Sequence, residues 1–322
     1  MFTREIHAIA REALDTRRER AEAIAAEREA KLHELCPEIR EIDTELSKTG
    51  LLIFKAALSG ADLSPIRKRN RELLERRRAL IVSLGYPEDY YTEPPYTCGK
   101  CQDTGKDADG KTCSCLKELL RIETVKASGI GKLIEKQSFE NFDLDWYGKG
   151  SKAYTKMQDN YNFCKNFADS FNEAKAATLL FVGSTGTGKT HLSTAIAKTV
   201  IEAGYSVIYD SIQNIMHAFE EDQFGKDKYR FSKEPYEPKA EKYLTADLLI
   251  VDDLGTEFTN QFTVSCLYNL LNTRQNRGLS TVISTNLSPD ELSEKYEGRI
   301  FSRLVGSDST ILLFVGKDHR LG

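Results

Sequence analysis

Apolar residues in the first part of the chain recur at the spacing of an α-helix. Between Thr3 and Ser47 almost the only helix breaker is Pro37, and apolar residues follow one another at alternating steps of three and four. They are Leu32, Leu35, Ile39, Ile42 and Leu46. Such spacing is typical of a coiled-coil seam. Arg28 and Arg18 interrupt the seam further back, which favours a short packed helix pair over a long rod.

A second amphipathic stretch runs from about Pro65 to Leu84, and Pro65 suits the first turn of a helix. The two stretches predict a helical hairpin. It is either an arm that docks a partner protein or a helical pair that folds back on its own core. Its high charge favours the arm, because a buried cap would carry fewer charged residues.

The second half of the chain alternates short apolar segments with helical stretches of a dozen or more residues. This order predicts an α/β fold in which a parallel sheet carries helices on both faces and binds its ligand at the carboxyl ends of the strands. The predicted strands are 179–182, 205–210, 247–252, 280–286 and 310–315. A further helix is expected over 153–174, before the first strand.

The first of these strands runs into a G-x-x-x-x-G-K-T motif that opens the next helix. Glycines let successive backbone N–H groups face a phosphate, and the helix start adds its positive end. Lys189 is expected to reach the β- and γ-phosphates, and Thr190 to offer its hydroxyl to Mg²⁺, so the cofactors predicted are ATP and Mg²⁺. A glycine turn that binds nothing is the alternative. The nucleotide-binding residues predicted are Gly183, Ser184, Thr185, Gly186, Thr187, Gly188, Lys189, Thr190 and His191.

Polar residues end two other strands and should reach the same edge of the sheet. Asp252 is predicted to hold Mg²⁺, and Asp253 to act as the catalytic base that orients the attacking water. The alternative for Asp253 is an N-cap of the helix starting near residue 259. Asn286 is predicted to fix that water or the γ-phosphate, with a role as a turn residue before Ser288 as its alternative.

Two short cysteine pairs are separated by a turn-rich loop. Four thiolates suit a structural Zn²⁺ with every position filled by protein, although a redox or iron–sulfur role is the alternative. The predicted zinc ligands are Cys98, Cys101, Cys113 and Cys115. The remaining three of the seven cysteines, Cys36, Cys164 and Cys266, are interpreted as packing residues.

Composition narrows the class of protein. The chain has 322 residues, of which 40 % are hydrophobic and 29 % charged, which is typical of a soluble globular protein. It contains no apolar run near the length of a membrane span and no signal peptide, so we expect a cytoplasmic protein without membrane contact. A net charge of −4 predicts no general affinity for nucleic acid. Residues 224–243 alternate cations with aromatic rings, which indicates either single-stranded DNA binding or a solvated flexible insertion.

Several motifs together resemble the AAA+ ATPases, and among them the DnaC/DnaI helicase loaders and the IstB transposition ATPases. The resemblance covers residues 138–320 and rests on 183–190, 248–253, 284–286 and 298–304. It implies that Arg303, on a helix expected over 289–304, is an arginine finger that reaches a neighbouring subunit's ATP. Arg299 is the second choice, and Arg320 would be the sensor arginine on its own nucleotide.

Two departures from the family pattern predict slow turnover. Most AAA+ proteins carry Glu where this chain has Asp253, and the sequence ends at Gly322 without a helical lid. The catalytic residues expected are therefore Lys189, Asp253, Asn286, Arg303, Arg299 and Arg320.

The predicted organisation is a helical partner-docking region (1–90), a zinc segment with a linker helix (91–137) and an AAA+ ATPase domain (138–322). The resemblance implies an ATPase that loads a replicative helicase, held by the N-terminal helices, and that forms a homo-oligomer on ATP binding and on single-stranded DNA. The alternatives are an IstB-like regulator of transposition, an ATP-gated adaptor that does not hydrolyse ATP, and a small-molecule kinase. The absence of a substrate lid argues against the kinase.

Overall fold

The chain folds into two compact units. The computed structural model describes residues 3–59, 63–171, 177–224, 238–296 and 298–318. Residues 8–117 form one unit, and residues 1–7 together with 118–322 form the other. None of the described helices is both long enough and apolar enough to cross a membrane.

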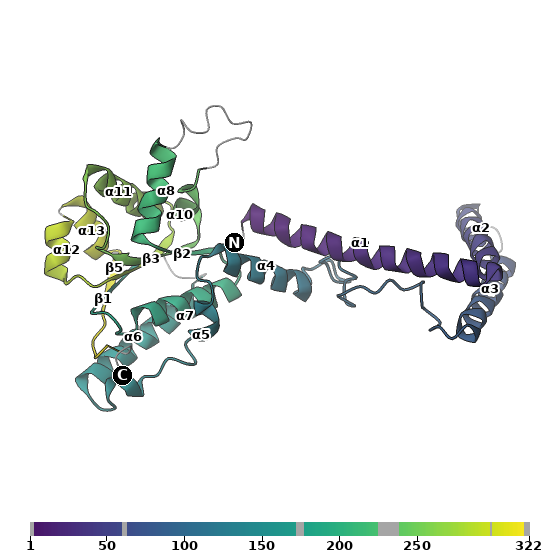
Figure 1. Cartoon of the computed structure of the whole chain (residues 1–322), viewed down its shortest axis with the longest axis horizontal. Helices are drawn as coiled ribbons and strands as arrows, with labels where there is room; N and C mark the ends of the chain where they lie inside the picture. Colours follow the sequence, from purple (N-terminus) through teal and green to yellow (C-terminus); the bar gives the residue numbers. More distant parts are fainter. Residues whose placement is uncertain (1–2, 60–62, 172–176, 225–237, 297, 319–322) are drawn as a thin grey trace. The chain divides into compact units, whose positions relative to one another are not determined.

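Three helices dominate the smaller unit: α1 (Arg4–Leu35), α2 (Pro37–Ser59) and α3 (Ser64–Ser83) (Figure 1). The predicted hairpin exists and is formed by α2 and α3, which pack against each other. The predicted continuous seam across Pro37 is wrong, because Pro37 has no N–H to continue α1 and instead starts α2. Leu35 consequently points to solvent with 55 % of its surface exposed, whereas Leu32 and Ile39 are fully buried.

A hydrogen-bonded carboxylate connects all three helices. Asp43 of α2 lies 2.8 Å from Nε2 of His33 on α1 and accepts hydrogen bonds from Nη1 of Arg77 on α3 at 2.9 Å and from the hydroxyl of Tyr91 at 2.5 Å. Burial opposes ionisation of Asp43, but these bonds outweigh it and hold the pKa of Asp43 below its usual value. Burial raises the pKa of Tyr91, and the hydrogen bond to Asp43 raises it further. The hairpin is therefore joined to α1 by polar as well as apolar contacts.

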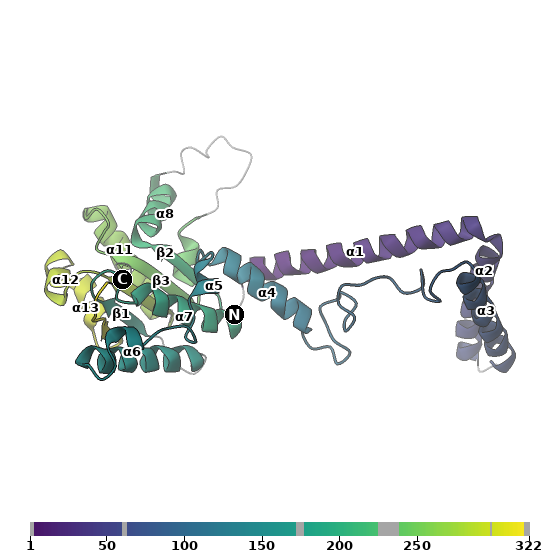
Figure 2. The ribbon, with the colours of Figure 1, turned by 60° about the horizontal axis from the view of Figure 1, so that its bottom comes forward.

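Residues 84–113, here called the return segment, follow α3 and run back along α1 (Figure 2). The contacts pair Tyr86 with Lys31, Tyr90 with Arg28, Tyr96 with Glu22 and Gly105 with Leu14. Gly105 has a φ of 74°, and a Cβ atom here would come within 2.9 Å of Cδ1 of Leu14, so its backbone passes close to this side chain of α1. A stretch that the sequence indicates as a linker is thus packed along a helix.

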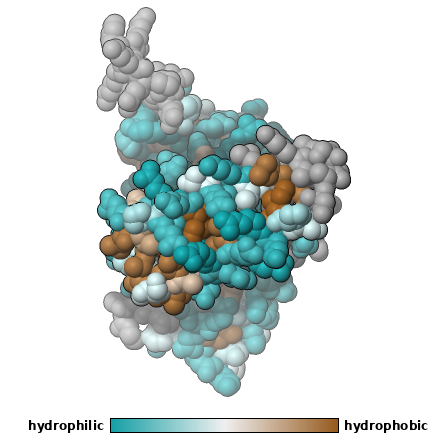
Figure 3. Space-filling model, turned by 90° about the vertical axis from the view of Figure 1, so that its right-hand side faces the viewer, coloured by the Kyte–Doolittle hydropathy of each residue, from teal (hydrophilic) through white to brown (hydrophobic). Residues whose placement is uncertain are grey.

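The surface seen from the end that carries α2 and α3 is mostly hydrophilic, with separate hydrophobic patches (Figure 3). Leu35, Leu52, Val82 and Leu84 are the large hydrophobic residues of α2, α3 and their flanks that are exposed among the described side chains.

A five-stranded parallel sheet forms the centre of the larger unit. In space the strands follow the order β2-β3-β4-β1-β5, and every pairing is parallel. The strands are β1 (Thr178–Val182), β2 (Val207–Ser211), β3 (Leu248–Leu254), β4 (Ser280–Thr285) and β5 (Ser309–Leu313). The predicted α/β fold and each predicted strand are confirmed to within a few residues. This order brings the carboxyl ends of β1, β3 and β4 to one edge of the sheet.

Alternate residues of the strands send their side chains to opposite faces of the sheet. Leu179 and Phe181 of β1 pack with α6 (Lys152–Asp169) and α7 (Lys189–Glu202) on one face. Leu180 and Val182 pack on the other face with α8 (Ile212–Phe224), α10 (Glu241–Thr245), α11 (Gln261–Asn276), α12 (Pro289–Lys295) and α13 (Arg299–Val305). Figures 1 and 2 show these two helical layers.

Two boundaries differ from the sequence-based expectation. The helix expected over 289–304 is divided into α12, which ends at Lys295, and α13, whose N-cap Gly298 has a non-helical φ of 63°. The helix expected over 153–174 ends at Asp169. Three short helices complete the described chain between the cysteines and α6: α4 (Ser114–Ala127), α5 (Leu133–Lys136) and the 3₁₀-helix η1 (Asp145–Tyr147).

Candidate nucleotide and metal sites

The glycine-rich loop joins β1 to α7, as the motif requires. Gly186 and Gly188 adopt φ values of 74° and 93°, which an L-residue with a side chain rarely takes. At Gly188 a Cβ atom would also come within 2.6 Å of the hydroxyl of Tyr147. Both glycines are therefore required by the backbone, and the loop forms the concave turn that backbone N–H groups need to surround a phosphate.

Lys189, the first residue of α7, connects the loop to the strand beside it. Its side chain is buried, and Nζ donates hydrogen bonds to the carbonyl oxygens of Gly183 (2.6 Å) and Ser184 (2.8 Å). A third bond of 2.9 Å goes to Oδ1 of Asn286, directly after β4. Because β4 pairs with β1, two residues almost a hundred positions apart meet at one edge of the sheet.

Asp252 and Asp253 lie at the carboxyl end of β3 in different conformations. Asp252 accepts hydrogen bonds from the hydroxyls of Tyr209 and Ser284. A register shift between Val251 and Leu254 gives Asp253 a left-handed φ of 56°, and its backbone N–H donates to Oγ of Ser284 at 3.0 Å. The alternative role of Asp253 as a helix N-cap does not apply, since Asn260 caps α11.

A pocket of about 730 Å³ brings most of the predicted residues together. Those that line it are Thr185, Gly186, Gly188, Lys189, Thr190, His191, Asp252, Asp253 and Asn286. Seven further residues line it that the sequence reasoning did not assign: Leu133, Gln137, Asn141, Phe142, Asp143, Tyr147 and Tyr209. The first group supplies cationic, hydroxyl and carboxylate groups, and the second adds an aromatic and amide-bearing wall.

That second wall is connected to the phosphate loop by rings. Phe142 stacks on Tyr147 and meets His191 edge-on, with ring centroids 5.9 and 5.1 Å apart. The hydroxyl of Tyr147 donates to the carbonyl oxygen of Thr187 at 3.1 Å. In the sequence, this wall is visible as a group of aromatic residues around 139–147. No local pattern, however, predicts that these residues face the phosphate loop.

The donor set fits a nucleoside triphosphate with its metal. Thr190 and Asp252 offer the oxygen ligands that Mg²⁺ prefers, and Lys189 supplies a cation beside the loop amides. In the second wall, Oε1 of Gln137 is buried without a hydrogen-bond partner among the described residues. A buried acceptor of this kind suits a ligand that brings its own N–H donor, such as a nucleobase.

The candidate finger arginines lie on α13, and neither lines the pocket. The guanidinium of Arg303 donates to Oδ1 of Asn272 (2.7 Å) and to the hydroxyl of Tyr268 (3.2 Å), and it lies over the Tyr268 ring. Arg299 is exposed at the start of the same helix. Arg320 lies outside the described residues.

The segment considered for DNA binding lies largely outside the described residues, which lack 225–237. At its described ends, Phe224 has 67 % of its surface exposed, Lys239 pairs with Glu221 at 2.9 Å, and Lys242 lies over the ring of Tyr243. These contacts neither support nor contradict DNA binding by this segment.

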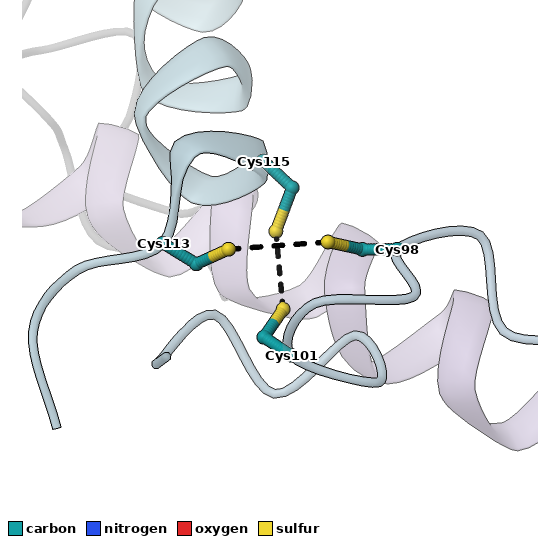
Figure 4. Close-up of side chains that lie close together, drawn as sticks. All are labelled: Cys98, Cys101, Cys113 and Cys115. Carbon is teal, nitrogen blue, oxygen red and sulfur yellow. Dashed lines mark hydrogen bonds between the residues drawn. The ribbon is translucent and has the colours of Figure 1, made fainter. Parts of the chain in front are cut away.

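All four cysteines of the predicted zinc site converge on one point (Figure 4). Cys98 and Cys101 come from the return segment, Cys113 precedes α4, and Cys115 lies in the first turn of α4. The sulfur atoms are 3.9 Å apart between Cys98 and Cys113 and 3.3 Å apart between Cys101 and Cys115, too long for disulfides. The buried carboxylate of Asp103 accepts from the backbone N–H groups of Thr97 and Cys98 and so shapes the first cysteine turn.

The arrangement fits Zn²⁺. Four thiolates at about 2.3 Å from one ion in a tetrahedron lie about 3.8 Å from one another, close to the observed spacings. A hydrogen bond from the backbone of Cys115 lowers the pKa of the Cys113 thiol to about 7, which makes the thiolate available to a metal. Burial raises the pKa of the Cys101 and Cys115 thiols, an effect that a bound cation would oppose.

The parallel sheet, the phosphate loop and the carboxylates at its edge define a P-loop nucleotide-binding protein. Over residues 123–302 the sequence matches the family described as "IstB-like ATP binding protein". This match covers more than half of the 322 residues, and the chain belongs to this family.

Individual relatives are more distant. The replicative helicase loader DnaC of Escherichia coli (strain K12) is 25 % identical over 197 residues, which cover 61 % of this chain and 74 % of DnaC. The uncharacterized protein YdaV of the same strain is 26 % identical over 243 residues, covering 72 % of this chain and 87 % of YdaV. Among solved structures, DnaI aligns with a TM-score of 0.45 at 20 % identity and covers 60 % of this chain and 95 % of its own.

Proposed function

We propose that this protein is an ATPase of slow turnover that loads a replicative DNA helicase and is switched by ATP. The observation that carries the ATPase part is one pocket at the carboxyl ends of three neighbouring strands. It collects Lys189 and Thr190 at the start of α7, Asp252 and Asp253 of β3, and Asn286 directly after β4. The loading part is supported by the similarity to the DnaC loader over 74 % of that protein's length.

Each pocket residue has a role that follows from its chemistry. Lys189 neutralises the triphosphate, and Thr190 and Asp252 hold the Mg²⁺ that shields the phosphates' charge. Asp253, exposed in its left-handed conformation, orients the attacking water and accepts its proton. Asn286 exchanges its hydrogen bond with Lys189 for a contact to that water or to the γ-phosphate. The shorter side chain of Asp at the base position is the reason for slow turnover.

Assembly into a homo-oligomer would bring an arginine of α13 to a neighbouring subunit's pocket, with Arg303 as the first choice and Arg299 as the second. Arg303 must then leave Tyr268 and Asn272, so its contacts within the subunit hold it in a resting position. Arg320 is proposed as the sensor arginine on its own nucleotide. These steps rest on the family resemblance and on the exposure of Arg299 and the partial exposure of Arg303.

The helical hairpin of α2 and α3 is proposed as the arm that binds the helicase. Its hydrophilic surface and its exposed Leu52 and Val82 suit a docking face. The four cysteines are proposed to hold a structural Zn²⁺, and residues 224–243 to contact single-stranded DNA. In this proposal residues 1–90 dock the partner, residues 91–137 form the zinc segment and linker helix, and residues 138–322 form the ATPase domain.

The second candidate function is regulation of transposition, because the family to which this chain belongs is described as IstB-like. The two functions differ in their partner. We would mix the full chain with a replicative helicase and circular single-stranded DNA, with ATP or without nucleotide, and measure helicase bound to DNA. Loading that requires ATP and is lost in Lys189→Ala supports the loader. Helicase loading at the level of the control without this protein would contradict it, and ATP-dependent stimulation of a transposase on duplex DNA would support the alternative.

An adaptor that binds ATP without hydrolysing it is distinguished more simply. Phosphate release by the parent chain is compared with that of Asp253→Asn. A parent rate no higher than the rate of a blank without protein would favour the adaptor, whereas equal rates above the blank would leave ATP hydrolysis intact and only exclude Asp253 as its base.

A further inference from the structure

Tyr209 lies beside the predicted metal carboxylate although it belongs to a different strand. It is the third residue of β2, the strand at the edge of the sheet, and its register partner is Ile250 of β3. Its side chain is 9 % exposed and packs in the apolar cluster on the α7 face of the sheet. Only its hydroxyl group reaches the polar edge, where it donates a 2.5 Å hydrogen bond to Oδ2 of Asp252.

The other oxygen of the same carboxylate is also held. Oδ1 of Asp252 accepts from the hydroxyl of Ser284 on β4, on the opposite side of β3. One hydroxyl from each neighbouring strand thus fixes the carboxylate plane. Hydrogen bonds to an ionised acceptor are about twice as strong as those between neutral groups, so this clamp is a firm one.

Holding both oxygens does not consume the carboxylate. Oδ1 also accepts a hydrogen bond of 3.2 Å from the backbone N–H of Asp253. Oδ2 accepts the bond from Tyr209, and its second lone pair remains for a metal ion or for its bound water. A phenol carries its proton at neutral pH and is therefore able to donate this bond. The apolar surroundings would accept Phe equally well, so packing alone does not explain the hydroxyl.

Tyr209 is also fixed through its backbone. Its N–H donates to the carbonyl oxygen of Ser128 at 2.6 Å, and a Cβ atom at Gly129 would come within 2.5 Å of its carbonyl oxygen. The segment that begins at Ser128 continues into Leu133 and Gln137 of the second pocket wall. The residue that orients the carboxylate is therefore held in place by the segment that leads into Leu133 and Gln137 of the same pocket wall.

We propose that Tyr209 is the positioning residue of the metal site: its hydroxyl, with that of Ser284, orients Asp252 and so sets the Mg²⁺ concentration at which the triphosphate binds. This inference rests on the proposed ATP-binding function. Loss of a group that orients a metal ligand typically weakens metal affinity by about 10- to 100-fold.

The test uses the full chain and the variant Tyr209→Phe. The matched control is Tyr243→Phe, because Tyr243 is also buried and donates to a carboxylate, Asp210, at 2.8 Å but does not line the pocket. Binding of a fluorescent ATP analogue is titrated with MgCl₂ and, separately, measured in EDTA. Tyr209→Phe should raise the half-saturating Mg²⁺ concentration by about 10-fold, with unchanged affinity in EDTA, and the control should behave as the parent.

The possible outcomes separate the two proposals. A parent chain whose binding shows no Mg²⁺ dependence contradicts the proposed metal site itself. A parent that responds to Mg²⁺ together with a Tyr209→Phe variant of identical response overturns the role of Tyr209. Equal loss of binding with and without Mg²⁺ would also overturn it, because that result indicates a structural role. Should Tyr209→Phe unfold at the assay temperature, Ser284→Ala removes the other hydroxyl of the clamp and must show the same Mg²⁺ shift.

Discussion

Nζ of Lys189 donates a 2.9 Å hydrogen bond to Oδ1 of Asn286, and this bond joins the phosphate loop to the strand next to it. A lysine ammonium group has three protons, and in this structure three oxygen atoms of the protein receive them. A triphosphate must therefore compete with the loop carbonyls and with Asn286 for the same cation. Nucleotide binding and the position of Asn286 are coupled through one side chain.

Replacing Lys189 by Ala should abolish ATP binding. The loop amides alone do not balance the charge of a triphosphate, and losing two charged hydrogen bonds at about 1.5 kcal/mol each corresponds to about 100-fold in affinity. Binding is measured by titration with a fluorescent ATP analogue. Lys198→Ala, on the same helix but outside the pocket, is the control and should bind as the parent. Tight binding by Lys189→Ala would exclude the phosphate-loop assignment.

Asp253→Asn should bind ATP normally but hydrolyse it about 10²- to 10⁴-fold more slowly, because a positioned general base contributes an effect of this size. Asn is the suitable replacement, since it tolerates the left-handed backbone at this position. Steady-state phosphate release and binding affinity are compared on the same samples. Unchanged hydrolysis would show that Asp253 is not the base.

Arg303→Ala should retain ATP binding and lose hydrolysis, since an arginine finger is worth about 10³- to 10⁵-fold in rate. Mixing it with Lys189→Ala should restore activity, because one variant supplies the arginine and the other the intact pocket. The same mixture is made with Arg299→Ala. If only Arg299→Ala is rescued while the chains associate, Arg299 is the finger, and the contacts of Arg303 with Tyr268 and Asn272 are purely structural.

Purified protein should contain about one zinc ion per chain, and Cys98→Ser together with Cys101→Ser should remove it, because two thiolates do not close a tetrahedral site. Cys36→Ser, in the same unit but away from the cluster, should keep the metal. Elemental analysis measures the zinc content of the parent chain and of each variant. Iron with visible absorbance would replace the zinc interpretation with an iron–sulfur one.

Arg274 should matter for stability and not for chemistry. It is fully buried, and its guanidinium donates to the carbonyl oxygens of Tyr243, Ala246 and Ser280 and to the hydroxyl of Thr281. Burial lowers its pKa to about 9. Arg274→Met leaves several buried acceptors without donors and should lower the free energy of unfolding by about 3 kcal/mol or more. Arg277→Met, half-exposed on the same helix end, should change it little, as measured by urea denaturation.

The phosphate loop was predictable because its geometry is local: the strand, the glycines and Lys189 are contiguous in sequence. The positions of Asp252 and Asn286 near the phosphate loop were also predictable, because the carboxyl ends of parallel strands lie at the same edge of a sheet. Tyr209 was not predictable in this way, because its role depends on β2 lying beside β3 and on a side chain that reaches past two register positions. Pro37 and Gly298 are residue types that commonly interrupt helices. The helical spacing of apolar residues nevertheless continues across both positions, and this spacing predicts unbroken helices there.

The pairing of the return segment with α1 limits how the length of the chain can change. Gly105 is fixed against Leu14 near one end of their contact, and Tyr86 against Lys31 near the other. Inserting one heptad into α1 between these anchors would increase their separation by about 10.5 Å. The return segment would need about three more residues of extended chain to span the added distance. Insertions and deletions in the two stretches must therefore occur together, so related proteins with a longer or shorter first helix should show a compensating change before their first cysteine pair.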